Sequence, residues 1–195
     1  MFKADQSNKD YHEAFWRHSL STAFASRIIA KRFQGGKVFN PDPAFSAGLI
    51  HDIGKMVICC FMPNEHKQIR KQLEENPELT DYQAELALFG FNHAHIGREL
   101  TMKWKLPNRL CDAIGFHHNP VEPNESQDFA FLLSLADYVA HVATYSNNKA
   151  EPRLQPTKGV FDYFGIDDQD IVSLKSNLAE EYLKADTFMR IAGIS

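Results

Sequence analysis

The amino-acid sequence predicts an all-α protein, folded as a compact bundle of helices. Apolar residues recur at three- and four-residue spacing through most of the chain, which is the pattern of amphipathic helices. We find no strand-like alternation of apolar and polar residues of convincing length and no internal repeat. The chain has 195 residues, of which 44% are apolar, so it is long enough to bury a sizeable core. We expect a single domain over residues 1–195, with a core at 9–145 and a C-terminal helical extension at 158–192.

The helices of the first half are predicted from apolar stripes and their punctuation. A first helix is expected over 9–33 and should end at Gly35 and Gly36. The loop 40–43 contains two prolines and can cap the next helix, which is expected to run from Ala44 to about Cys60. The segment 62–65 should break that helix, and the alternating charges that follow suit a solvated helix at about 65–75.

The second half is divided by turns and caps in the same way. Thr80 and Gln83 have the spacing of a capping box for a helix that reaches about Phe89. Polar, proline-bearing loops are expected at 119–127 and 146–157, the second of them flexible. The remaining helices are expected at 92–104, 107–117 and 128–145, followed by a short helix and a longer amphipathic one within 160–191.

Composition excludes several classes of function. A net charge of −4 and a pI near 6.1 argue against a broad surface for nucleic acid or anionic membranes. The N-terminus has no apolar core of signal-peptide length, and no window approaches about 18 uninterrupted apolar residues, so we expect no membrane span. The cysteines, Cys59, Cys60 and Cys111, are interpreted as reduced core thiols of a cytoplasmic protein.

Histidine and aspartate occur at positions where burial would be costly. His51 and Asp52 are adjacent and lie between two apolar runs. Asp137 lies in the middle of the most apolar predicted helix. A buried carboxylate is expensive unless it is paired with a cation. Asp137 therefore indicates a positive charge in the core.

The remaining histidines provide candidate partners. His18 lies in the first helix, His93 and His95 begin the helix at 92–104, and the pair His117 and His118 ends the helix at 107–117. Imidazole and carboxylate together suit zinc, iron, manganese or nickel. One or two ions are expected, and Asp52 can bridge a pair of metals about 3.5–4 Å apart.

Lys55 follows His51 by four residues, about one helical turn, so the two side chains share a helix face. It can neutralise phosphate charge or protonate a leaving group, which makes Lys55 and Asp52 the candidate catalytic residues. Each feature alone also has a structural explanation. His18 can hydrogen-bond within the bundle, His117 and His118 can be favoured by a helix dipole, and Lys55 can be a surface charge.

The same segments resemble the HD superfamily, and most closely its HDOD subgroup, the HD-related output domain of bacterial signalling proteins. They follow the family order over about residues 15–140. The resembling segments are 15–19, 44–55, 85 with 89–97, 104–107, 113–120 and 135–137. The resemblance implies a helical HD-type domain, and it selects His93 rather than His95, because Gly97 follows four residues later as in the motif.

The resemblance extends to the HD-GYP cyclic-di-GMP phosphodiesterases, a sister group. Their conserved lysine falls on Lys55. After the position of His118, the HD-GYP proteins continue with an acidic residue and a glycine-tyrosine-proline loop. This chain has a different sequence there, residues 119–124, which argues against cyclic-di-GMP as substrate. Only about fourteen residues precede the first motif, fewer than typical HDOD proteins have, so we expect a trimmed N-terminal segment. The metal-binding positions of the HD-GYP phosphodiesterases fall on His18, His51, Asp52, His93, His117, His118 and Asp137.

Two functions follow from these residues and from the resemblance. The first is a metal-binding regulatory domain that also binds a nucleotide or a signalling protein, with little or no turnover. The alternative is an active phosphohydrolase that cleaves a nucleotide or cyclic dinucleotide, with Lys55 stabilising charge on the phosphate. Intact ligand types favour the alternative, whereas the replaced loop favours the regulatory domain. A purely structural role leaves the carboxylate of Asp137 without a cation.

Overall fold

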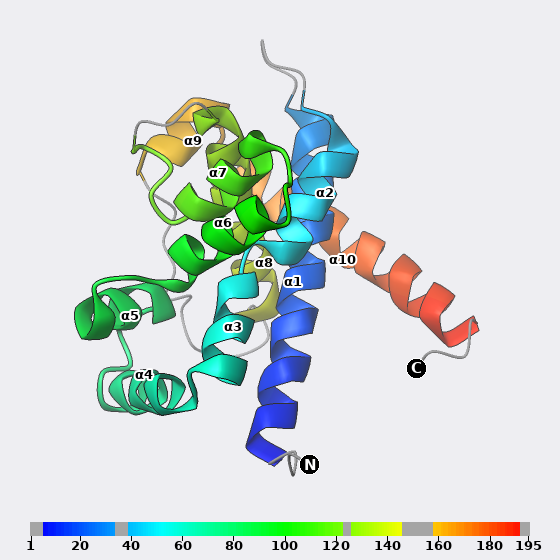
Figure 1. Ribbon diagram of the computed structural model, residues 1–195. Helices are drawn as coiled ribbons and strands as arrows, with labels where there is room; N and C mark the ends of the chain where they lie inside the picture. The colour runs from blue at the N-terminus through cyan, green and yellow to red at the C-terminus, as the bar shows by residue number, and fades with distance from the viewer. Residues whose placement is uncertain (1–5, 34–38, 123–125, 146–157, 192–195) are drawn as a thin grey trace.

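The computed structural model describes residues 6–33, 39–122, 126–145 and 158–191, and within these ranges it contains α-helices and no strand. The prediction of an all-α fold is confirmed. Figure 1 shows α1 as a long rod, with α2 beside it and α8 behind, and α10 leaving the assembly towards the C-terminus. The helices are α1 (Gln6–Arg32), α2 (Pro41–Ile50), α3 (Ile53–Phe61), α4 (Pro63–Glu75), α5 (Asp81–Phe89), α6 (His93–Lys103), α7 (Asn108–Phe116), α8 (Gln127–Tyr145), α9 (Lys158–Phe164) and α10 (Asp168–Ile191).

The predicted caps explain where several helices begin. The Asn40 side chain accepts a hydrogen bond from the backbone N–H of Asp42 at the start of α2. Thr80 and Gln83 form both hydrogen bonds of a capping box at α5, as predicted. The Asn92 side chain caps α6 in the same manner, so the first residue of that helix is His93. The expected helix stop at Gly35 and Gly36 and the expected loop at 146–157 lie outside the described residues.

The single helix predicted from Ala44 to about Cys60 is wrong, because the chain turns at His51 and Asp52 and forms α2 and α3 instead. Both new helices are held by close backbone packing. A Cβ atom on Gly48 of α2 would lie 2.6 Å from the carbonyl oxygen of Thr22, and one on Gly54 of α3 would lie 2.0 Å from that of His93. The turn lets α2 pack on α1 and α3 pack on α6 at these points, and it places both turn residues in the core.

The main core surrounds α8. Leu132, Leu133 and Leu135 of this helix are fully buried, and α8 packs against α1, α7 and α10. A smaller apolar cluster joins α3, α4 and α5 through Ile58, Ile69, Leu73 and Ala84. Burial of apolar area at about 25 cal/mol per Å² is the main favourable term for such helices. The core therefore fixes α8 beside α1, where the polar residues of both helices meet.

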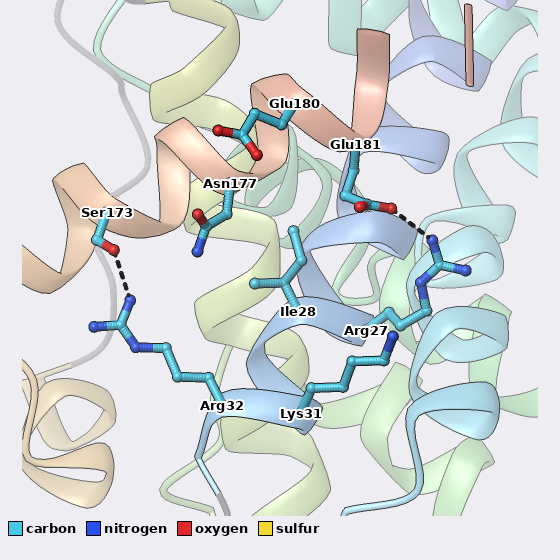
Figure 2. A pocket seen from close by; sticks show the side chains of 8 residues that line it. All are labelled: Arg27, Ile28, Lys31, Arg32, Ser173, Asn177, Glu180 and Glu181. Carbon is cyan, nitrogen blue, oxygen red and sulfur yellow. Dashed lines mark hydrogen bonds and ion pairs between the residues drawn. The ribbon is translucent and has the colours of Figure 1, made fainter. Parts of the chain in front are cut away.

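A groove of about 510 Å³ separates α1 from α10 (Figure 2). It is bridged at both ends, because Arg27 pairs with Glu181 at 3.0 Å and Arg32 donates to the Ser173 hydroxyl at 2.9 Å. These contacts attach the predicted C-terminal extension to the first helix.

Within the described residues, one stretch, Pro41–Phe61, is long and apolar enough to cross a membrane by length and composition alone. The sequence criterion of uninterrupted apolar residues did not detect it, because His51, Asp52 and Lys55 interrupt the run. The stretch is divided into α2 and α3, and these three side chains turn towards other helices. Such packing is typical of a core segment.

The cysteines only partly follow the prediction. Cys59 and Cys111 are buried, as expected for core thiols, but Cys60 is exposed. Adjacent residues on a helix point about 100° apart, so one apolar run cannot bury both members of the pair.

Candidate metal centre

The residues predicted as metal ligands gather in one place. They come from α1, the α2–α3 turn, the first residue of α6, the end of α7 and the middle of α8. Two groups form, and within each the potential donor atoms lie within 4.8 Å of one another. The first group is His18, His51 and Asp137, and the second is Asp52, His93, His117 and His118.

Asp52 faces both groups, with one carboxylate oxygen directed to each. Its Oδ1 lies 3.1 Å from Nε2 of His93 and 3.7 Å from Nε2 of His117. Its Oδ2 lies 3.3 Å from Nε2 of His51 and 3.9 Å from Nε2 of His18. This is the arrangement of a carboxylate that can bridge two cations.

Backbone carbonyls fix the orientation of two imidazole rings. His51 Nδ1 donates to the carbonyl oxygen of Gly48 at 2.8 Å, and His117 Nδ1 donates to that of Ile114 at 2.7 Å. Because a carbonyl can only accept, each Nδ1 carries the proton, and in the neutral ring the lone pair is on Nε2. In the neutral form that binds a metal, both lone pairs therefore face the centre.

Glu85 has the same role for His93. Its Oε2 accepts from the His93 backbone N–H at 2.6 Å and from the ring Nδ1 at 2.7 Å. The sequence analysis did not include Glu85 among the site residues, but it is only 2% exposed. By contrast, His95, the other histidine considered for this position, is exposed.

Two buried polar atoms at the centre lack hydrogen-bond partners among the described residues. They are Nε2 of His117, and Oδ1 of Asp52, which makes only the ion-pair contact of 3.1 Å with Nε2 of His93. A buried carboxylate oxygen without a partner is costly, and a cation between it and the imidazole nitrogen would satisfy both atoms. A bound cation would also explain why Nε2 of His93 lies only 2.9 Å from Nε2 of His118. The residues present therefore fit divalent metal ions.

Opposing charges determine the protonation of the metal-free centre. Burial disfavours charged imidazoles, but Asp52 and Asp137 outweigh it and raise the pKa of His51 to about 10. For His93, burial and the charge of Lys55 lower the pKa, but Glu85 and Asp52 outweigh them and raise it to about 9. Protons on these two rings balance the buried carboxylates when no other cation does so.

The rings of His18, His117 and His118 remain neutral. Burial lowers the pKa of His18 to about 4 despite its hydrogen bond to Asp137. Burial and the neighbouring His51 lower the pKa of His117 to about 3. Burial also lowers the pKa of His118 well below its usual value. Neutral imidazole is the form that binds a metal.

Lys55 and His141 lie beside the candidate ligands and complete the centre. Lys55 Nζ lies 2.7 Å from Oδ2 of Asp52 and 3.8 Å from Oδ2 of Asp81. His141 was missed by the sequence analysis. It lies one turn after Asp137 in α8, and its Nδ1 is 3.1 Å from Oδ1 of Asp137. The spacing of four residues on one helix is the signal that could have identified it.

A cavity of about 340 Å³ opens onto this centre. Its walls come from α1, α3, α4, α5 and α8. The helix α4 contributes Arg70, which is exposed and forms no ion pair among the described side chains. The lining includes aromatic rings, cations and the edge of the metal centre. These residues are Tyr11, Phe15, Arg17, His18, Asp52, Lys55, Arg70, Asp81 and His141.

Comparison with known proteins gives a family and a fold. The model of the HDOD domain matches residues 1–120, which is more than half of the chain. An uncharacterized protein from Treponema pallidum (strain Nichols) is 21% identical over 182 residues, which cover 93% of this chain and 34% of the relative.

Several solved structures have a similar fold, among them the following two. A proposed signal transduction protein from Marinobacter aquaeolei has a TM-score of 0.74 at 24% identity, over 92% of this chain and 38% of that one. A proposed phosphohydrolase from Shewanella amazonensis has a TM-score of 0.65 at 24% identity, over 86% of this chain and 59% of that one. These likenesses show the fold. The chain spans about a third of the length of the Treponema and Marinobacter proteins.

Proposed function

The chain belongs to the HDOD family, and we propose that it is a regulatory domain of bacterial signal transduction that binds two divalent transition-metal ions. The observation that carries this proposal is the position of Asp52, which directs one oxygen to each group of histidines. Asp52 Oδ1 and His117 Nε2 support it, because both are buried metal donors whose hydrogen-bonding capacity is not satisfied among the described residues.

The two groups of donors divide between the two ions. His18, His51 and Asp137 would hold the first ion together with Oδ2 of Asp52. His93, His117 and His118 would hold the second together with Oδ1 of Asp52. The donor set suits iron, manganese, zinc or nickel. When bound, such ions supply Lewis-acid stabilisation of charge on phosphate oxygens.

Elemental analysis of the full chain without a histidine tag tests the metal centre. We expect about two equivalents after reconstitution with Mn²⁺, an ion that imidazole and carboxylate donors bind and thiols do not favour, and removal of free metal. Asp52→Ala should lose most of both, because it removes the shared ligand. Asp128→Asn is a matched control, since Asp128 is also buried but pairs with Arg109 away from the centre. A content near zero in the reconstituted protein would overturn the proposal.

A second candidate function is hydrolysis of a nucleotide or cyclic dinucleotide phosphoester. The cavity favours it, because Lys55 and Arg70 line the same opening as Asp52. A phosphate group in the opening would meet these cations, and Lys55 can stabilise charge on its oxygens. The cavity volume is at the lower end of small-molecule sites, which run from about 300 to 1,000 Å³. The descriptions of the Shewanella and Marinobacter proteins support hydrolysis and signalling respectively, by analogy of fold alone.

Turnover distinguishes the two functions. The metal-loaded protein is incubated with nucleoside phosphates and cyclic dinucleotides, and phosphate or nucleotide release is measured. Release that Asp52→Ala abolishes would establish the hydrolase. If the chain is a regulatory domain, we expect the metal-loaded protein to bind nucleotides or signalling proteins and to release no hydrolysis product. The reduced thiols of Cys59 and Cys111 are consistent with the cytoplasmic location that we propose for it.

A further inference from the structure

A second cluster of metal donors lies outside the centre described above. We propose that His12, Cys59 and Cys60 bind one thiophilic divalent cation of the zinc type. His12 comes from α1, and the two cysteines lie near the end of α3. Nε2 of His12 is 3.8 Å from Sγ of Cys59, and one donor atom from each of the three residues lies within 4.8 Å of the others.

The distances suit one tetrahedral ion. With zinc–sulfur bonds of about 2.3 Å and zinc–nitrogen bonds of about 2.0–2.1 Å, a tetrahedral angle places sulfur and nitrogen about 3.6 Å apart and two sulfurs about 3.8 Å apart. The observed 3.8 Å between Cys59 and His12 is close to this value. A small rotation of the exposed Cys60 side chain would complete the set, with solvent in the fourth position.

The donor chemistry separates this cluster from the Asp52 centre. Thiolates select soft or borderline ions such as Zn²⁺ over Mn²⁺ and Mg²⁺. The Asp52 centre contains imidazole and carboxylate donors and no sulfur. The cluster is therefore expected to discriminate against Mn²⁺ more strongly than the Asp52 centre does.

The structural alternative is a thiol–imidazole hydrogen bond between Cys59 and His12, with the Cys60 thiol hydrogen-bonded to that of Cys59, and it would give no metal-dependent signal. Burial raises the pKa of the Cys59 thiol, and the neighbouring Cys60 adds to this effect. A cation that binds Cys59 must therefore displace the proton of its thiol. Binding of one divalent ion by two thiols and one neutral imidazole releases two protons to solvent.

The cluster lies next to the cavity above the Asp52 centre. Lys55 is one turn before Cys59 on α3, and Tyr11 immediately precedes His12 on α1. Both residues line the cavity. A cation held by His12, Cys59 and Cys60 would join α1 to α3 at the rim of this opening and fix the position of both helices there.

Cobalt provides a specific probe of this cluster. Co²⁺ bound to thiolate gives a charge-transfer band in the near ultraviolet, and the sulfur-free Asp52 centre cannot contribute to it. We expect the band when the reduced full chain is titrated with Co²⁺, with its loss on addition of Zn²⁺. His12→Ala and Cys60→Ser should each weaken formation of the band by at least about tenfold.

Cys111→Ser is the matched control, because Cys111 donates to the carbonyl oxygen of Leu106 elsewhere in the fold. It should leave the band unchanged. Cys60 is exposed, so Cys60→Ser is not expected to disturb folding, which circular dichroism checks. Absence of the band in the parent chain, or an undiminished titration in Cys60→Ser, would overturn the proposal. Loss of metal from the Asp52 centre would leave the band intact, so the two proposals fail separately.

Discussion

Glu85 is the residue on which the orientation of His93 depends. It accepts hydrogen bonds from the backbone and from the ring of His93, so it holds Nε2 of that ring towards Asp52. We predict that Glu85→Gln weakens metal binding about 10–100-fold, as is usual when the partner of a ligating histidine is lost. Competition with a chromophoric chelator measures the affinity.

Glu74→Gln is the control for that substitution, because Glu74 is exposed on α4. It removes the same charge without touching His93. Equal affinities for the two variants would mean that Glu85 does not position the ring, and that its burial has another cause.

The contrast between His93 and His95, which both lie on α6, provides a second prediction about the metal ligands. His93 is fully buried and faces Asp52, whereas His95 is exposed two residues later. We expect His93→Ala to lose about one of two metal equivalents and His95→Ala to lose none, because only the first removes a donor. Elemental analysis of both variants decides this. A loss of metal in His95→Ala would contradict the assignment.

At the scale of elements, the contact between α3 and α6 positions His93 against Asp52. Gly54 makes this contact possible, since a Cβ there would lie 2.0 Å from the carbonyl oxygen of His93. We predict that Gly54→Ala lowers the free energy of unfolding by about 1–3 kcal/mol or more, because backbone must move. Alanine otherwise stabilises a helix relative to glycine by about 1 kcal/mol, so the sign is diagnostic. Urea denaturation measures it.

Gly159→Ala in α9 is the control, because its nearest neighbour is a side-chain atom of Val121 at 3.2 Å, which can move. We expect a much smaller change there. Gly54→Ala should also reduce the metal content, since the separation of α3 from α6 withdraws His93. A stable Gly54→Ala variant with full metal content would contradict the packing argument.

The helices themselves could be predicted because their signals are local. Apolar spacing and the cap residues Asn40 and Thr80 act within one or two turns. The turn at His51 and Asp52 could not be predicted in this way, because it depends on the approach of α1 and α6 to the flanking glycines. Long-range packing overrode the helical pattern of 44–60 at that point.

At the scale of the whole molecule, the centre exists only when distant parts of the chain are assembled. The HDOD model matches residues 1–120, yet Asp137 and His141 are supplied by α8, beyond that range. The sequence predicted the convergence of Asp137 with the histidines from the cost of burying a carboxylate. It did not predict Glu85, whose partner His93 lies on another helix, and it overlooked the four-residue spacing of His141 from Asp137. Only the packing of α5 on α6 and of α8 on α1 places them at the centre.

The stability of the metal-free protein should therefore depend on pH through the buried histidines. The pKa values of His51 and His93, about 10 and about 9, exceed the usual value of about 6.5. Their contributions are complete below about pH 6.5 and are lost as the pH rises to 9–10. His18 and His117, with pKa values of about 4 and about 3, act oppositely, because below about pH 6.5 the unfolded chain takes up protons that the folded chain does not.

These opposing effects give the metal-free protein a stability maximum near pH 6.5. Bound metal changes the alkaline side, because an ion takes the place of the protons on His51 and His93. For each proton displaced, the apparent metal affinity should rise about tenfold per pH unit between about 6.5 and 9. We predict that the difference in Tm between metal-loaded and metal-stripped protein widens over this interval. Thermal denaturation followed by circular dichroism at several pH values measures it, and the Asp52→Ala variant should show no such divergence. Parallel curves for loaded and stripped protein would mean that the ions bind away from these histidines.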